Sequence, residues 1–169
     1  MRYREPPEGG AMLAISTGYY DTLKFFHVLA AITWVGSAIY AQALATKVMG
    51  EGDPARLAAT AKDIGDLGKR LITPSAIAVL VLGVWIVAVS AWNFTDTWVL
   101  LGLAGIAATI ATGAGFLGPE SERLGKLAAN RDPSDPEIQR RIKRIFAISR
   151  IDVVVLVLVV ADMVFKPGS

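Results

Sequence analysis

The chain has no cysteine and a single histidine, and both scarcities restrict its chemistry. Without cysteine, thiol catalysis, thiolate metal sites and disulfides are excluded. One histidine excludes a bis-histidine haem within one chain, and no HExxH or GxSxG motif is present. Charged residues are also few, at 19% of 169 residues, while 53% are hydrophobic. This balance excludes an ordinary soluble domain, where charged residues reach about 25%, and a disordered chain.

The hydrophobic residues gather in four blocks, each about 20 residues long, the length that crosses a bilayer. The blocks cover about 23–44, 72–92, 98–117 and 146–165. We predict an all-α fold, a four-helix membrane bundle in which residues 19–169 form one domain. Residues 1–18 lack the apolar core of a signal peptide and are expected to be a disordered tail. Met12 is an alternative to Met1 as the natural start.

Local signals mark several helix ends. Asp53-Pro54 and Asp135-Pro136 each place a capping side chain before a proline at the first helical position. Both pairs lie in long charged connections, which we expect to be helical. Gly118-Pro119 is expected to stop the third helix.

Basic residues set the expected orientation. The connection of residues 93–97 carries no Lys or Arg, whereas both long connections are rich in them. By the positive-inside rule, the two long connections are cytoplasmic and both termini lie outside. Contact with the lipid bilayer therefore explains the mild basicity, and no nucleic-acid partner is required.

His27 is the candidate ligand within the first span. It lies about four residues inside the outer end of that span, and Trp34 follows two turns along the same helix face. Gly36 leaves room for a flat ligand or another helix. Imidazole is a common ligand of metals and of haem iron. The alternative is a buried histidine that hydrogen-bonds a neighbouring helix.

Further polar residues in the spans need partners as well. Asp162 lies at a depth similar to that of His27 and could accept a hydrogen bond from the imidazole, which would fix its tautomer. It could instead pair with Lys166 or Lys24. Met163 is a second candidate iron or copper ligand. Nearer the cytoplasm, we predict a structural ion pair between Arg150 and Glu120.

Small residues recur every four positions along the third span, at Gly105, Thr109 and Gly113. Such spacing lets helices approach closely in lipid. The stripe predicts packing, either within one chain or across a homodimer or with another membrane protein.

Three segments carry a resemblance to a known family: Leu23–Gly36, Gly113–Ser121 and Ser149–Gly168. They resemble small bacterial proteins grouped as predicted integral membrane proteins, the domain of unknown function 2269. The His27, Trp34 and Gly36 run is also similar, more loosely, to copper-resistance D-type proteins and to the membrane haem-binding protoporphyrinogen oxidase. These resemblances imply a bacterial plasma membrane location and a haem or copper role for His27.

The leading functional hypothesis is a membrane protein associated with b-type haem or copper. His27 would be the ligand, and Trp34, Gly36 and Asp162 would surround the bound group. Two other classes stay open. A non-catalytic accessory subunit would expose a face of small residues, and a small transporter would line several spans with polar residues.

Overall fold

The computed structural model describes residues 8–128 and 130–168, with side chains from residue 18 onward. This part of the chain forms helices joined by turns and contains no strand, so the all-α prediction is confirmed. In chain order the elements are α1 (Glu8–Glu51), α2 (Pro54–Leu67), η1 (Gly68–Ile72), α3 (Thr73–Val89), α4 (Thr97–Thr112), η2 (Gly113–Leu117), α5 (Gly118–Ala128) and α6 (Pro136–Phe165). The helix α1 already begins within the predicted tail 1–18, whose residues 1–7 lie outside the described part.

The two Asp-Pro pairs begin helices as predicted. Asp53 accepts hydrogen bonds from the backbone N–H groups of Ala55 and Arg56, and Pro54 is the first residue of α2. Asp135 accepts from the N–H of Glu137 at the start of α6. These caps satisfy backbone donors that a helix leaves unpaired at its N-terminus.

The predicted helix stop at Gly118-Pro119 is wrong. The chain passes from α4 through the π-helical turn η2 directly into α5, and it passes from α2 through η1 into α3 in the same way. Each π-helical turn is followed by a proline, Pro119 or Pro74. In a regular α-helix, proline clashes with the carbonyl four residues earlier. Here that carbonyl belongs to a π-helical turn, whose wider spacing accommodates the proline, so the helix continues.

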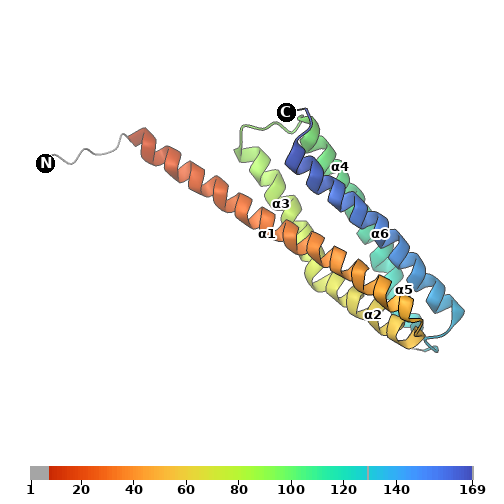
Figure 1. The fold of residues 1–169 in the computed structure, drawn as a ribbon. Coiled ribbons are helices and arrows are strands. Elements are labelled where there is room, and N and C mark those ends of the chain that lie inside the picture. The colour runs from red at the N-terminus through yellow and green to blue at the C-terminus, as the bar shows by residue number, and fades with distance from the viewer. Residues whose placement is uncertain (1–7, 129, 169) are drawn as a thin grey trace.

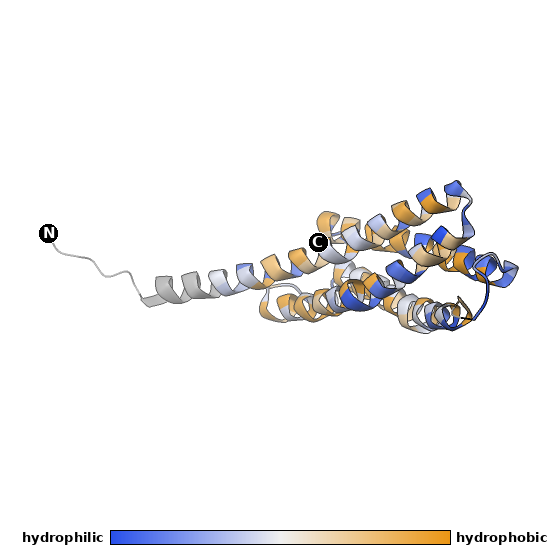
Figure 2. Cartoon of the chain, turned by 90° about the horizontal axis from the view of Figure 1, so that it is seen from below, coloured by the Kyte–Doolittle hydropathy of each residue, from blue (hydrophilic) through white to orange (hydrophobic). Residues whose placement is uncertain are grey.

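As a result, the charged connections are extensions of the long helices (Figure 1). Figure 2 shows hydrophilic residues concentrated at one end of the molecule, where α2, α5 and the start of α6 lie. We call this the charged end. The opposite end, with the turn of residues 90–96 and the C-terminus, is the hairpin end (Figure 1).

Three helical segments are long and apolar enough to cross a membrane: Gly18–Glu51, Pro54–Val89 and Thr97–Ala128. They contain the first and third predicted spans and all but the last three residues of the second. The fourth predicted span lies in α6, which carries Arg150, Asp152 and Asp162 among its apolar residues. Those charges distinguish α6 from the other three segments.

The helices pack in two pairs, α1 along α3 and α4 along α6. Trp34 of α1 is buried at the centre, in a core that also contains Val79, Ile106 and Leu156 and so draws on all four long helices. Toward the charged end, α1 contacts α6 directly, where Gln42 Nε2 donates to the Phe146 carbonyl at 3.3 Å. A second core, around Val48, Ile138 and Ile142, fills the charged end.

Two of the three residues of the small-residue stripe pack within the chain. A Cβ added to Gly105 would overlap Cγ2 of Val159 on α6, and Thr109 is buried on the same side of α4. Gly102, one turn earlier, is buried against Met163 and Asp162. A Cβ added to Gly113, the third residue of the stripe, would meet nothing within 4 Å. Packing across a homodimer or with another membrane protein stays a prediction.

Candidate functional site

The half-buried His27 side chain packs against α3, next to a glycine. Its Cε1 would lie 3.0 Å, and its Nδ1 3.5 Å, from a Cβ added to Gly83. Nδ1 is buried and has no hydrogen-bond partner among the described residues. The ring therefore occupies the space left by the missing Gly83 side chain, a position that sequence reasoning did not identify.

The neighbours predicted for His27 do not gather around it. The Trp34 side chain is only 5% exposed and is part of the central core, so its ring has no face left for a ligand. Gly36 is exposed, and a Cβ added there would meet nothing within 4 Å. These two residues do not form a flat-ligand surface with His27.

Asp162 and Met163 lie against α4, whereas His27 lies against α3. The Met163 methyl group occupies the space beside Gly102, and Asp162 Oδ2 would lie 3.5 Å from a Cβ added there. Both carboxylate oxygens of Asp162 are buried without a hydrogen-bond partner, so the predicted Asp162–His27 hydrogen bond is not formed. Its absence follows from the helix pairing, because α1 packs along α3 and α6 packs along α4.

The end of α6 closes over two tryptophans. Lys166 Nζ lies 4.4 Å from the centroid of Trp92 and 5.1 Å from that of Trp98, within cation–π range. The two indole rings meet edge to face at 5.3 Å. This contact fixes the C-terminal end of α6 against the turn that joins α3 to α4.

The predicted Arg150–Glu120 ion pair is replaced by another. Glu120 on α5 is buried, and its Oε1 lies 2.5 Å from Nη1 of Arg141 on α6. Arg150 is exposed and donates instead to Thr46 Oγ1 at 3.5 Å. Arg141 was missed, although Glu137 four residues before it is a signal for an ion pair along one helix face.

Arg141 holds two carboxylates at once. Its Nη2 lies 3.0 Å from Glu137 Oε1, in addition to the contact with Glu120. Hydrogen bonds to Glu137, and then to Glu120, raise the pKa of the Arg141 guanidinium. Hydrogen bonds from Arg141 and then Arg131 lower the pKa of Glu137. This network joins α5 to α6 at the charged end.

No group of three or more His, Asp or Glu side chains with metal-binding geometry occurs among the described residues. The candidate ligands His27 and Met163 belong to different helix pairs. A copper ion needs several converging ligands, and this arrangement does not supply them.

Comparison with known proteins identifies one family. A family model described as "Predicted integral membrane protein (DUF2269)" matches residues 21–167, which confirms the family predicted from the sequence. No curated protein and no solved structure matches the chain. The looser similarity to copper-resistance D-type and haem-binding oxidase proteins stays a prediction.

Proposed function

We propose that this chain, which belongs to the predicted integral membrane protein family DUF2269, crosses a bacterial plasma membrane four times and binds a b-type haem through His27. The observation that carries the haem proposal is the position of the half-buried His27 side chain, whose Nδ1 is buried against α3 beside Gly83. A histidine binds haem iron through one ring nitrogen, so burial of Nδ1 against α3 leaves Nε2 for that bond.

Haem fits the residues of this chain better than copper does. One imidazole would suffice to hold a haem iron, with Nε2 of His27 as the donor. When bound, haem would supply redox chemistry that the side chains lack. The chain's contribution would be to hold the imidazole between α1 and α3 and to exclude water with the surrounding apolar residues.

An absorption spectrum tests the haem proposal. We expect the full chain, purified from a haem-replete host, to show a Soret band. His27→Ala should abolish that band because it removes the ligand. Asp162→Asn is the matched control, since it changes a buried polar group of the other helix pair, and it should keep the band. A colourless wild-type protein, or a band that survives His27→Ala, would overturn the proposal.

A colourless preparation would favour the other function of this residue, which is packing. His27 would then serve to fill the space beside Gly83, and the chain would be a non-catalytic membrane subunit. His27→Gln separates these roles by stability, because a side chain of similar reach retains much of the contact with α3 and cannot replace an imidazole as an iron ligand.

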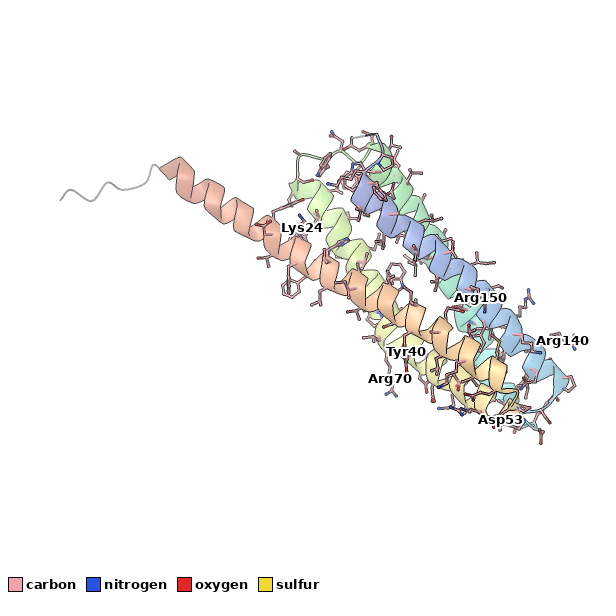
Figure 3. All side chains as sticks on the ribbon, in the orientation of Figure 1. Lys24, Tyr40, Asp53, Arg70, Arg140 and Arg150 are labelled. Atoms are coloured by element: carbon pink, nitrogen blue, oxygen red, sulfur yellow. The ribbon has the colours of Figure 1, made fainter. Side chains whose placement is uncertain are left out.

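The fourth span is α6, and the support for it is the arrangement of charge along the helix. Its apolar stretch packs along α4, and exposed Arg150 lies toward the charged end (Figure 3). The turn of residues 90–96 carries no Lys or Arg, whereas the charged end is rich in both. The positive-inside rule then places the charged end in the cytoplasm and both termini outside.

The absence of cysteine makes this topology directly testable. Thr95→Cys places one thiol in the turn at the hairpin end, and Asn130→Cys places one at the charged end; both positions are exposed. We expect a membrane-impermeant maleimide to label intact cells at residue 95 and not at residue 130 until the membrane is opened. Labelling of both positions in intact cells, or the reverse pattern, would refute the proposed orientation.

A further inference from the structure

A hollow opens between α5 and α6 at the charged end, away from His27. It has a volume of about 320 Å³ and is lined by Glu120, Glu137, Arg140, Arg141 and Arg144. That volume is within the lower range of ligand sites. Figure 3 shows Arg140 at this end of α6, in the same region as the turn with Asp53.

The carboxylates of the hollow are already neutralised. Glu120 forms ion pairs with Arg141 at 2.5 Å and with Arg123 at 3.6 Å. Glu137 forms ion pairs with Arg141 at 3.0 Å and with Arg131 at 2.8 Å. With three different arginines serving two glutamates, no acidic charge in the hollow is left for its remaining cations.

Those remaining cations are Arg140 and Arg144. Neither forms an ion pair within residues 18–128 and 130–168. They are four residues apart on α6, so they lie on one face of the helix, and both are exposed. Two guanidinium groups on one face present a fork of donors suited to a phosphate.

The position of the hollow along the helices matches the depth at which lipid headgroups lie in a bilayer. The Arg144 guanidinium lies 5.0 Å from the centroid of Phe116, which belongs to η2 at the end of the apolar part of the third long helix. Phe146, two residues beyond Arg144, is buried. The hollow therefore lies where the apolar stretch gives way to the charged end, which is the level of phosphates in a bilayer.

We propose that this hollow binds the phosphate of an anionic phospholipid, with Arg140 and Arg144 as its donors. Arg141 acts as a positioning residue, because its bond to Glu120 holds α5 and α6 at the separation that leaves the hollow open. The inference is independent of haem binding, since the hollow and His27 share no residue.

Thermal unfolding with soluble lipids tests the proposal. The full chain in a zwitterionic detergent at fixed salt would be titrated with dihexanoyl phosphatidylglycerol, dihexanoyl phosphatidylcholine or inorganic phosphate. A ligand that binds the folded state raises the melting temperature in a saturable way. We expect a saturable rise with phosphatidylglycerol and a much smaller one with phosphatidylcholine and inorganic phosphate.

Charge-matched variants separate a defined site from general attraction. The pair Arg140→Gln/Arg144→Gln should raise the half-saturation concentration about tenfold, as expected when a bidentate guanidinium contact is lost. The pair Lys126→Gln/Lys143→Gln removes the same charge from exposed positions outside the hollow, and should shift it less than about twofold, as for solvent-exposed charges. Arg140→Gln alone changes an exposed side chain that has no ion pair among the described residues, so it should give an intermediate loss if the double variant fails to fold.

Several results would overturn the proposal. Equal losses in the two double variants would show attraction by overall charge, and no loss with Arg140→Gln/Arg144→Gln would place binding elsewhere. An equal response to phosphatidylcholine would remove the anionic headgroup as the ligand. An equal response to inorganic phosphate, lost with Arg140→Gln/Arg144→Gln, would refute the lipid and identify a free phosphate anion as the ligand.

Discussion

The contact between α4 and α6 at Gly105 gives the sharpest test of how this fold is held together. A Cβ added to Gly105 would overlap Cγ2 of Val159. Valine is stiff at χ1 within a helix, so its methyl group cannot turn away at little cost. The substitution Gly105→Ala should therefore push the two helices apart or force Val159 off its rotamer.

The magnitude follows from comparison with a second glycine. Overpacking a tight contact costs about 1–3 kcal/mol. Replacing glycine by alanine inside a helix gains up to about 1 kcal/mol in water from the chain itself. Gly36→Ala is the matched control, because it is helical and exposed, and a Cβ there meets nothing within 4 Å. The helix gain is common to both variants, so Gly105→Ala should be less stable than Gly36→Ala by about 1–3 kcal/mol.

Reversible unfolding in mixed micelles, followed by helical circular dichroism, would measure this difference. Val159→Ala removes the methyl that would be overlapped, so Gly105→Ala/Val159→Ala should be more stable than the sum of the two single changes predicts. Gly102→Ala should be tolerated better than Gly105→Ala, because the group beside it is the flexible end of Met163. Equal stability of Gly105→Ala and Gly36→Ala would refute the close α4–α6 packing.

Two further predictions concern the charged end. Arg141→Ala should lower the melting temperature more than Arg140→Ala, because it leaves buried Glu120 with only Arg123 at 3.6 Å, and adding Glu120→Gln should recover part of the loss. Acid should also destabilise this end. Folding lowers the pKa of Glu137 from its ordinary value of 4.5, so the ionised carboxylate stabilises the fold above pH 4.5. That contribution is lost as the pH falls through the lower folded-state pKa. Glu137→Gln should reduce, without abolishing, the dependence of the melting temperature on pH below 4.5, because hydrogen bonds from Ser134 lower the pKa of Asp132 as well. An unchanged pH dependence would refute the role of Glu137.

The features that the sequence predicted correctly are those fixed by neighbouring residues. Asp53 and Asp135 cap helices through N–H groups two or three positions away, so their partners are given by the sequence itself. The length of the apolar blocks is likewise a local property, and three of them lie in helices able to cross a membrane.

The neighbours of each helix were not predictable in the same way. Depth along a span can be counted from the sequence, and on that basis a contact between His27 and Asp162 was one of two alternatives. Contact also requires adjacent faces, and those are set by where small residues let two helices approach. Gly83 brings α3 to His27, while Gly102 brings α4 to Asp162, so the two polar groups separate into different helix pairs.

The wrong prediction of a helix stop at Pro119 also explains the wrong prediction of an Arg150–Glu120 ion pair. If the third helix stopped at Gly118-Pro119, Glu120 would lie at the membrane boundary, near Arg150. Because η2 carries the helix past Pro119, Glu120 lies on a continuous rod that extends alongside the early part of α6. It meets Arg141, nine residues and roughly 13 Å of helix before Arg150. The same continuation places α5 beside Arg140 and Arg144, so the π-helical turn that accommodates Pro119 also creates the two walls of the proposed phosphate site.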